Sequence, residues 1–451
     1  MQDWASGYVS DLTYTYGYYN ELNPFRLRLA FLSAGIVFPE VMTACELGYG
    51  QGLSANIHAA ATPTRWVGTD FNPSQASYAI QLADETHSGA ELFDESFLEF
   101  SNRNDLPDFD YIGLHGIWSW ISDENRAVIV DFIKRKLKVG GVVYVSYNTL
   151  PGWGAFAPIR HLMTQHADVI GSSGLGLINR IGGAIDFATQ LMDTNPIYSR
   201  ANPLVAERLK KLKEQDKHYL AHEYFNRDWH PMHFSQMADW LEPAKLQYAC
   251  SANFLDHIDA INLTAEQQAF LQAVPDRMFK QSVRDFIVNQ QFRKDYWVKG
   301  LRSLSPLKQI ELLRNERLVL VTPVNDINFK VTTDVGEVAL SEQIYKPVID
   351  LLSDHKIYSI KQLESGLKEK HINFGQLLQA LTVLSGLGFV ASAQDDASIN
   401  KSRKSSDALN LHLINSARDS SDVSYLASDL IQKLLSSACM YFECPPAKSS
   451  D

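Results

Sequence analysis

Two acidic residues and a glycine-rich turn between them are the residues best placed for chemistry in this chain. Residues 46–52 read Glu-Leu-Gly-Tyr-Gly-Gln-Gly and follow an apolar run, and a second apolar run ends at Asp70, followed by Phe71 and Asn72. Two apolar runs that each end in a carboxylate, with a G-x-G-x-G turn after the first, are typical of an α/β sheet that binds an adenosine-bearing cofactor. The sequence therefore predicts a cofactor site at residues 46–72.

The spacing of the glycines separates two classes of cofactor. A dinucleotide fingerprint needs a glycine three positions after the second one, and that position is Leu53 here, whereas Gly52 comes two positions after Gly50. Glu46 would repel a pyrophosphate but suits the amino group of a methionine moiety. We therefore predict S-adenosylmethionine rather than NAD. An ordinary glycine-rich turn is the alternative, and the two carboxylates argue against it.

Individual roles follow from this interpretation. Gly48, Gly50 and Gly52 let the backbone lie against the cofactor, and Asp70 accepts hydrogen bonds from both ribose hydroxyls. Further contacts to the cofactor are predicted for residues beside the strand ends and in the N-terminal segment; these are Tyr18, Glu46, Phe71, Asn72, Ser96, Phe97 and His115. Ser96 and Phe97 suit the adenine through hydrogen bonding and stacking. His115 is as readily a structural histidine as a cofactor contact.

The remaining candidates suit methyl transfer from a sulfonium to an amine, and lysine is the amine that the family resemblance described below implies. An unperturbed lysine with a pKa of about 10.4 is neutral in about one molecule in a thousand near pH 7.4, a handicap of roughly 4 kcal/mol. An aromatic channel would lower the lysine pKa by desolvation and would favour the sulfonium through cation-π contact. The candidate catalytic residues are Tyr14, Tyr16, Tyr19, Trp118, Tyr147, Asn148, Trp153 and Glu223. Core packing is the alternative for each ring taken alone, while Asn148 and Glu223 could orient the amine or accept its proton.

Strands alternating with helices must position these groups. We expect strands at 42–47, 65–70, 92–93, 110–115 and 142–147, with helices at 54–61, from the N-cap Asn72 to about 87, and at 124–137. Gln75 is placed to close a capping box with Asn72. Such alternation predicts a parallel sheet that binds its ligand at the carboxyl ends of the strands.

The rest of the chain divides into further segments. We predict a catalytic domain at 1–153 plus 219–260, which includes a helix at 234–241 and a late strand at 244–250, and a helical insertion at 154–218 that serves as a lid or a dimer interface. A helical middle region follows at 261–325, helical through 277–297 and ending in a strand at 318–324. Residues 326–392 resemble a winged helix, with a strand at 329–333, helices beginning near Ser341, Ser359 and Asn373, and a last strand near Val390. Residues 393–451 are a linker and tail, mobile over 393–408, with a short helix near 425–436.

Composition narrows the functional classes. The 451 residues are 45% hydrophobic and 21% charged, as in an ordinary globular protein, and the net charge of −11 disfavours nucleic acids and anionic membranes. The start of the chain lacks a secretion signal and no apolar stretch is long enough to span a bilayer, so we expect a cytoplasmic location and no membrane partner. The four cysteines show no C-x-x-C spacing, and His222-Glu223 is not part of H-E-x-x-H, so we expect neither disulfides nor a metal.

Several longer segments resemble a known family. They are residues 7–24, the loop at 46–52, Tyr-Asn-Thr-Leu-Pro-Gly-Trp at 147–153, Ala-His-Glu-Tyr at 221–224, Asp285-Phe286 and Phe292-Arg293. Together they are similar to class I methyltransferases with a methyltransferase regulatory domain, nearest to rickettsial-type protein-lysine methyltransferases that act on an outer-membrane surface protein. The resemblance covers most of residues 1–390. It implies a Rossmann-like cofactor domain, a middle domain used in homodimers, a C-terminal winged-helix-like domain, and an outer-membrane protein, met before export, as a substrate.

The leading prediction is S-adenosylmethionine-dependent N-methylation of lysine in a protein by a homodimer, with S-adenosylhomocysteine as the product. A small-molecule methyltransferase is one alternative. A nucleic-acid methyltransferase is disfavoured because residues 115–118 read His-Gly-Ile-Trp, where amino-methylating DNA enzymes usually have Pro-Pro-aromatic. A non-catalytic cofactor-binding regulatory protein is the alternative from a different class.

Overall fold

A seven-stranded sheet forms the centre of the molecule. A computed structural model of the chain describes residues 16–171, 174, 176–215, 217–333 and 336–419. The strands of the main sheet are β1 (Thr43–Leu47), β2 (Arg65–Asp70), β3 (Glu91–Asp94), β4 (Phe109–Leu114), β5 (Leu137–Asn148), β6 (Leu246–Ser251) and β7 (Phe292–Lys299). Their order is β3-β2-β1-β4-β5-β7-β6, with β7 antiparallel to both its neighbours and the other pairings parallel. The predicted Rossmann-like α/β fold is thus confirmed.

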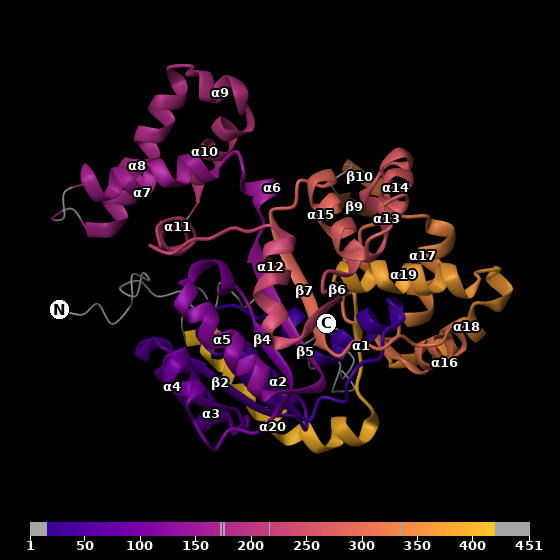
Figure 1. Ribbon diagram of the computed structural model, residues 1–451. Coiled ribbons are helices and arrows are strands. Elements are labelled where there is room, and N and C mark those ends of the chain that lie inside the picture. Colours follow the sequence, from indigo (N-terminus) through magenta and orange to yellow (C-terminus); the bar gives the residue numbers. More distant parts are fainter. Residues whose placement is uncertain (1–15, 172–173, 175, 216, 334–335, 420–451) are drawn as a thin grey trace, which may run out of the picture.

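Helices cover both faces of this sheet (Figure 1). The helices of this region are α1 (Pro24–Ser33), α2 (Leu53–Ala61), α3 (Pro73–Thr86), α4 (Phe97–Ser101), α5 (Asp123–Lys136), α6 (Leu150–Trp153) and α12 (Phe234–Leu241). Because side chains alternate along a strand, Tyr144 faces a core shared with α1 while Val143 and Val145 face a core shared with α5 and α12. Both faces of the central strands are therefore buried, as their continuous apolar runs require.

A helical module stands away from the sheet, at the top of Figure 1. It consists of α7 (Ala157–Val169), α8 (Gly176–Asp193), α9 (Ile197–Ala201), α10 (Leu204–Glu214) and α11 (Lys217–Tyr224). The module has its own core, which includes Met163, Ile181 and Leu209. Helices α7 to α10 lie within the insertion expected at 154–218, whereas α11 extends past it to Tyr224. The path of the chain returns through α11 to the sheet.

The helices predicted for the middle region end earlier than expected. The structure has α13 (Asp259–Asn262), α14 (Ala265–Gln272) and α15 (Arg277–Ile287), and the chain then forms β7. The prediction of helix through residue 297 was therefore wrong. Asn289 adopts a left-handed conformation with φ of 49°, which ends the helical path, and the aromatic and β-branched residues after it favour a strand that completes the sheet.

The C-terminal unit packs beside α1 and is joined to the sheet by a shared core. It contains α16 (Pro306–Asn315), β8 (Arg317–Leu320), β9 (Lys330–Thr333), β10 (Gly336–Ala339), α17 (Glu342–Leu352), β11 (Tyr358–Ser359), α18 (Ile360–Gly366), α19 (Phe374–Gly386) and β12 (Val390–Ser392). Strand β8 lies between β11 and β12 in a small antiparallel sheet. The expected helix starts at Ser341, Ser359 and Asn373 are confirmed, with capping boxes at the last two. The winged-helix assignment and the domain boundaries stay predictions.

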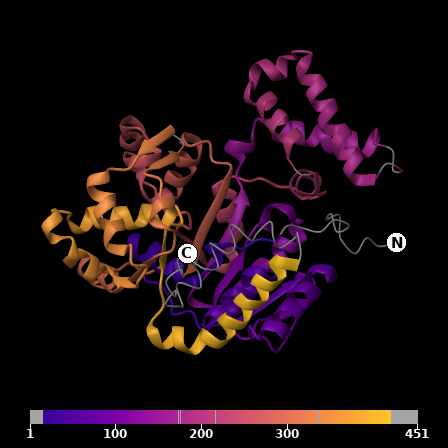
Figure 2. The same cartoon turned by 180° about the vertical axis from the view of Figure 1, so that it is seen from behind.

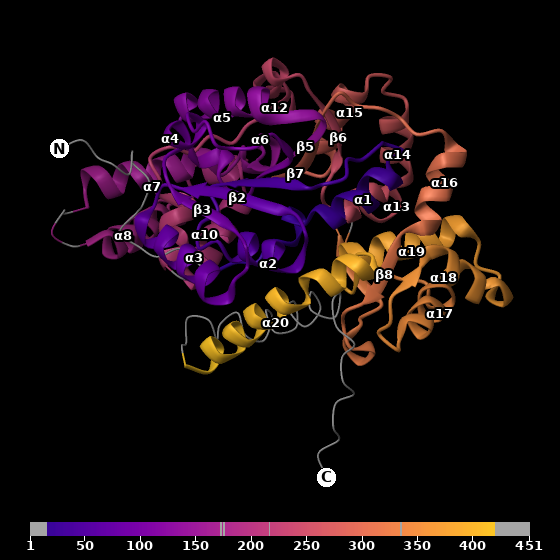
Figure 3. The same ribbon diagram turned by 90° about the horizontal axis from the view of Figure 1, so that it is seen from below.

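The segment predicted to be a mobile linker is a helix. Helix α20 (Asp396–Asp419) runs along α2 and α3 on the back of the main sheet, where Figures 2 and 3 show it in yellow. Ile399, Leu409 and Leu413 are buried, as are Ser402 and Ser406 on the same face. A face built partly from serines has the composition of a linker, which is why the prediction for 393–408 was wrong. The helix predicted near 425–436 lies outside the described residues.

Candidate functional site

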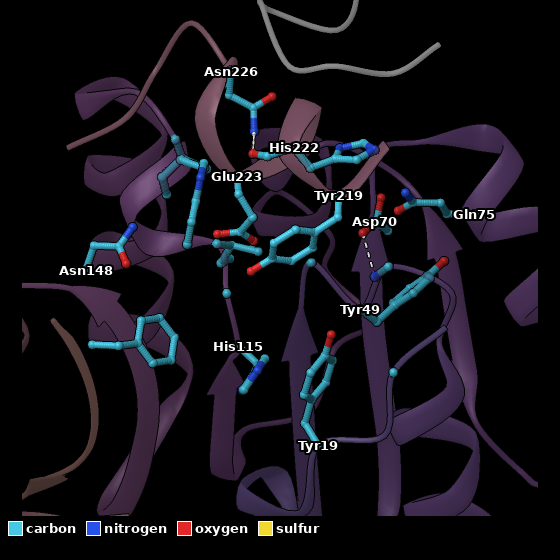
Figure 4. A pocket seen from close by; sticks show the side chains of 18 of the residues that line it. Tyr19, Tyr49, Asp70, Gln75, His115, Asn148, Tyr219, His222, Glu223 and Asn226 are labelled. Carbon is cyan, nitrogen blue, oxygen red and sulfur yellow. Dashed lines mark hydrogen bonds between the residues drawn. The ribbon is translucent and has the colours of Figure 1, made fainter. Parts of the chain in front are cut away.

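A cavity of about 530 Å³ opens at the carboxyl ends of β1, β2, β4 and β5. This is the edge at which open α/β sheets bind their ligands. Its floor and walls come from the loops after these strands, and α11 lies over it as a roof (Figure 4). The site therefore combines residues from several segments between positions 17 and 226 with residues 291 and 292 at the start of β7.

The glycine loop follows β1 and borders the cavity. Gly48, Gly50 and Gly52 have φ of 72°, 58° and 66°, a region that glycine adopts without strain. A Cβ at Gly50 would meet only Gln75 Oε1 at 3.9 Å, so the backbone there can approach a ligand closely. A Cβ at Gly52 would instead lie 2.4 Å from Ala79 Cβ, so Gly52 allows α2 and α3 to pack together. Gly48 and Gly50 line the cavity, whereas Gly52 does not.

Asp70 is held in place by the backbone of the same loop. Its Oδ2 accepts from the Gly50 N–H at 2.8 Å and its Oδ1 accepts from the Asn72 N–H at 3.0 Å. Burial raises the Asp70 pKa to about 6, although these backbone donors favour the charged form. Because a carboxylate offers about four acceptor positions, the side chain retains capacity for two ligand hydroxyls.

Glu46 is the most unusual group of the cavity. It is 2% exposed, and its Oε2 has no hydrogen-bond partner among the described residues. Burial, and secondly the charge of Asp70, raise the Glu46 pKa to about 8. A buried carboxyl group of this kind is stabilised by a cation, so it fits the ammonium group of a bound amino acid moiety.

An aromatic stack closes the side of the cavity below the glycine loop. Tyr19 stacks on His115 with ring centroids 3.8 Å apart, and His115 Nδ1 lies 2.8 Å from the Tyr144 hydroxyl. Burial lowers the His115 pKa to about 3, so the imidazole is neutral at physiological pH. The pair thus presents an uncharged, flat surface to the cavity.

The roof of the cavity comes from α11 and the residues after it. Tyr219, His222, Glu223 and Asn226 all line the cavity, and Figure 4 shows Tyr219 and Glu223 pointing down from the helix. Helix α7 fixes this roof, because Arg160 is buried and donates to the backbone carbonyl oxygens of Tyr224 and Asn226.

The wall formed by β5 and α6 adds an amide and an indole. Asn148 is 4% exposed, its Nδ2 has no hydrogen-bond partner among the described residues, and the side chain lines the cavity. Trp153 lies beneath the guanidinium of Arg208, which is 3.9 Å from the indole centroid. Arg208 also donates to the Tyr224 hydroxyl at 3.3 Å, so α10 contributes a cation to this wall.

The structure brings most of the predicted residues together. Those that line the cavity are Tyr19, Glu46, Gly48, Gly50, Asp70, Phe71, Phe97, His115, Asn148, Trp153 and Glu223. Tyr14 lies outside the described residues.

Other predicted residues have different surroundings and do not line the cavity. Tyr147 is fully buried and donates to Asp295 Oδ2 at 2.9 Å, and Trp118 is fully buried in the core next to Trp240. Tyr16 packs against Tyr78, and Tyr18 packs against His58. Ser96 and Asn72 cap α4 and α3 through their side chains, and Asn72 accepts from the Ser74 N–H. The capping box predicted for Gln75 is wrong, because Gln75 lines the cavity instead.

The sequence alone did not indicate several cavity residues. They are Tyr49, Gln51, Gln75, Ile117, Ile121, Arg208, Tyr219, Asn226 and Gln291. Of the other lining residues, His222, Tyr224 and Phe292 belong to segments that carry the resemblance, and Trp120 is one of the rings expected after the fourth strand. Tyr49 and Gln51 are the variable positions of the glycine motif and were available as a signal. Arg208 and Gln291 had no local signal, because only the folded module and the missed strand bring them to the cavity.

The residues present fit S-adenosylmethionine. Glu46 suits its ammonium group, Asp70 its ribose, and the neutral ring surfaces of Tyr19 and Phe97 its apolar parts. The described residues contain no group of three or more His, Cys, Asp or Glu side chains arranged to hold a metal ion. Within the same residues, no helix combines the length and the apolar surface needed to cross a membrane.

Comparisons with known proteins agree with this geometry. A family model described as "Predicted methyltransferase regulatory domain" matches residues 216–299. The chain is 40% identical to the uncharacterized protein sll1526 of Synechocystis sp. over 433 residues, which are 95% of this chain and 85% of that protein. It is 29% identical over 287 residues to the uncharacterized protein RP789 of Rickettsia prowazekii, covering 60% of this chain and 49% of that one.

Among solved structures, the fold is similar to that of PKMT2 from Rickettsia typhi in complex with AdoHcy. The TM-score is 0.63 at 20% sequence identity, and the match covers 84% of this chain and 77% of PKMT2. At this identity the likeness shows a shared fold, and it spans both the sheet and much of the chain after it.

Proposed function

Because the chain belongs to the class I S-adenosylmethionine-dependent methyltransferases that carry a methyltransferase regulatory domain, we propose that it methylates lysine side chains of a protein. The observation that carries the lysine assignment is the roof and wall of the cavity. There Glu223 points down from α11 beside the ring of Tyr219, and Asn148 lies on the β5 wall (Figure 4). Tyr19 lines the same cavity farther down, next to His115. A carboxylate within an aromatic enclosure suits a long cationic side chain.

The cofactor side of the cavity is assigned to the two buried carboxylates. Glu46 binds the ammonium group of the methionine moiety, and Asp70 accepts from the ribose hydroxyls while the Gly50 backbone keeps the approach open. S-adenosylmethionine supplies, when bound, a methyl group on a positively charged sulfur. The neutral His115 imidazole suits a wall near such a cation, since a charged imidazolium would repel it.

The amine side has a different task, which is to keep the lysine nitrogen neutral and aligned. The rings of Tyr19, Trp153 and Tyr219 replace water around the amine and so lower its pKa. The Asn148 carbonyl accepts a hydrogen bond that orients the nitrogen, and Glu223 accepts the proton that the ammonium group loses. These groups position the amine for in-line attack, which is the main contribution a protein can make to methyl transfer.

The remaining parts of the proposal concern the cell and the partners. We assign the protein to the cytoplasm, as a homodimer, with an outer-membrane protein met before its export as the substrate implied by the resemblance. Both described cysteines, Cys45 and Cys250, are buried and unpaired, which suits a reducing compartment. The negative net charge suits a lysine-bearing substrate.

Transfer of isotope from methyl-labelled S-adenosylmethionine to a lysate tests the proposal. We expect label in protein, recovered as methyl-lysine after hydrolysis. Glu223→Gln should lower the rate of labelling by about 10²-fold or more, the usual contribution of a general base. Binding of S-adenosylhomocysteine, measured by calorimetry, should stay unchanged in this variant.

Glu214→Gln is the matched control, because Glu214 is an exposed glutamate at the end of α10 outside the cavity. It should label protein at the unchanged rate. Label confined to small metabolites would instead identify a small-molecule methyltransferase, and cofactor binding without any labelling would favour a non-catalytic binding protein.

A further inference from the structure

A second polar cavity lies between β6, β7 and α15, on residues separate from those of the methyl-transfer site. Its volume is about 230 Å³, and none of its lining residues lines the larger cavity. The cationic side chains among its lining residues are Arg277, Lys280, Arg284, Arg293 and Lys294, and the acidic ones are Asp256, Asp259 and Asp295. His257 also lines it, and burial lowers the His257 pKa, so the ring adds no positive charge. Cations therefore outnumber carboxylates around this space.

Two of the five cations are already neutralised by close partners. Arg293 forms ion pairs with Asp285 and Asp295, the latter at 2.8 Å, and Lys294 pairs with Glu21. The charges of Arg293 and Lys294 are therefore compensated within the protein. The cations that remain are the three on α15.

Arg277, Lys280 and Arg284 lie on one face of α15, because their spacing of three and four residues corresponds to one helical turn each. Arg277 donates to the backbone carbonyl of Ala249, a neutral acceptor. Lys280 forms no ion pair with any described residue. Both side chains therefore bring positive charge to the cavity without a carboxylate of their own.

Arg284 is the strongest indication of a ligand. It is 7% exposed, and its Nε has no hydrogen-bond partner among the described residues. The nearest carboxylate oxygens, on Asp256 and Asp259, lie 3.8 Å away. Asp256 is itself engaged, since it accepts from the Ser251 hydroxyl and from the Asn253 amide. A buried guanidinium with such loose partners is under-compensated, and an oxyanion in the cavity would correct this.

The cavity also touches the segment that borders the methyl-transfer site. Gln290 lines the small cavity, and the next residue, Gln291, lines the large one. The backbone carbonyls of Gln290 and Gln291 accept from the N–H groups of Gly152 and Thr149, each at 2.9 Å. A Cβ at Gly152 would lie 2.6 Å from the carbonyl oxygens of Asn289 and Gln290. Helix α6 and the turn at 288–291 are therefore in close contact, with no room for a larger side chain.

We propose that the cavity between α15, β6 and β7 binds a small anion bearing carboxylate or phosphate groups, held by Arg277, Lys280 and Arg284. Its occupant stabilises the turn at 288–291 and thereby changes the affinity of the neighbouring site for its cofactor. The binding itself stands apart from the proposed function, whereas the coupling rests on it.

Calorimetric titration of the full chain with inorganic phosphate, and separately with succinate, tests the binding. We expect at least one probe to bind, and Lys280→Gln to weaken it by roughly tenfold to a hundredfold, the usual loss for a hydrogen bond to a charged group. Lys346→Gln is the matched control, because Lys346 is an exposed lysine on α17 that does not line the cavity, and this variant should bind as the unchanged chain does. Binding of phosphate alone assigns phosphorylated ligands to the site, and binding of succinate alone assigns carboxylates. Failure of both probes at millimolar concentration, or unchanged affinity in Lys280→Gln, overturns the site.

Titration with S-adenosylhomocysteine in the presence and absence of the saturating probe tests the coupling. Since linkage is reciprocal, we expect its affinity to change by about fivefold or more, and the change to disappear in Lys280→Gln. Equal affinity for S-adenosylhomocysteine with and without the probe overturns the coupling but does not contradict the anion site. Absence of any S-adenosylhomocysteine binding would count against the proposed function instead, while the phosphate and succinate titrations would keep their meaning.

Discussion

At the scale of single residues, Glu46 and Asp70 show how this site exchanges stability for binding. Both side chains are buried, and burial raises the pKa of each, to about 8 and about 6. Asp70 is supported by the Gly50 and Asn72 N–H groups, whereas Glu46 Oε2 has no such donor. A buried carboxyl group without a partner destabilises the folded state at neutral pH, so its presence is best explained by the cation that it binds.

The pH dependence of stability should reveal Glu46. The carboxyl group titrates near 4.5 when unfolded and near 8 when folded, so the folded chain holds the extra proton between these values. The stability this provides is complete below the unfolded pKa and is lost as the pH rises through 8. Glu46→Gln stays neutral, so its thermal midpoint should exceed that of the unchanged chain by a few °C at pH 8.5 and match it at pH 5. Scanning calorimetry at both pH values checks this, and a lower midpoint for Glu46→Gln at pH 8.5 would contradict it.

Glu46→Gln should also weaken the binding of S-adenosylmethionine. The ammonium group requires the ionised form of Glu46, so binding of S-adenosylmethionine by the unchanged chain should release a proton below pH 8 and strengthen as the pH rises toward that value. Glu46→Gln should lose this pH dependence together with about tenfold or more in affinity. Calorimetry in two buffers of different ionisation enthalpy measures the proton release. Equal heats in the two buffers at pH 7 would show that Glu46 is not the linked group.

Asp70 offers a complementary test of the ribose contact. Asp70→Asn keeps the shape but replaces one acceptor oxygen by an NH2 group, which donates hydrogen bonds and cannot accept them from a ribose hydroxyl or a backbone N–H. We expect S-adenosylhomocysteine to bind at least about 30-fold more weakly, as for one or two lost charge-assisted hydrogen bonds. Asp94→Asn is the control, because Asp94 ends the next strand but is exposed and does not line the cavity. Equal affinity for both variants would mean that the ribose lies elsewhere.

The sequence predicted which residues lie at the carboxyl ends of the strands, but not which of them face the cavity. Glu46, Asp70, His115 and Asn148 were found because residues at the carboxyl end of a parallel strand meet at one edge of the sheet. Tyr147 was not distinguishable from Asn148 in this way, yet side chains alternate along a strand, so Tyr147 points to the buried Asp295 while Asn148 points to the cavity.

At the scale of elements, the two errors have a common origin in segments whose partners are distant in sequence. Strand β7 pairs with β5, about 150 positions earlier, and helix α20 packs on α2, more than 330 positions earlier. Local periodicity carries no information about such partners, which decide between helix and strand or between helix and linker. The elements whose signals were local, such as the helices that begin at Ser359 and Asn373, were predicted correctly.

Helix α20 should contribute measurably to stability. Leu409 and Leu413 are 2% and 3% exposed and pack with Leu53, Ile57 and Leu82. Each substitution by alanine should lower the free energy of unfolding by about 2 kcal/mol or more, because it leaves a cavity. Leu411→Ala is the matched control on the same helix, since Leu411 is 61% exposed and should be within about 0.5 kcal/mol of the unchanged chain. Equal effects for buried and exposed positions in urea unfolding would show that α20 does not dock as described.

At the scale of the whole molecule, the helical module and the sheet share one site. The module has its own core, but Arg160 of α7 fastens the residues at the end of α11 that roof the cavity between the two. The module joins the sheet through α6, because Trp153 of α6 packs in the core of the module while Asn148, just before α6, ends β5. Such an arrangement permits the roof to open and close while both cores stay intact.

Hydrogen exchange distinguishes a roof that closes over the cofactor from a module that serves as a dimer interface. If α11 closes, S-adenosylhomocysteine should slow amide exchange in α11 and in the glycine loop at 48–52, while exchange in the distant α9 stays the same. Arg160→Met should reduce the added protection of α11 and leave that of the glycine loop, because the carbonyls of Tyr224 and Asn226 lose their donor. If the module instead joins two copies, protection of its exposed face should rise with protein concentration and ignore the cofactor. Protection of the glycine loop without any in α11 would therefore reject the closing roof, and with it the arrangement of Glu223 on which the proposed lysine recognition rests.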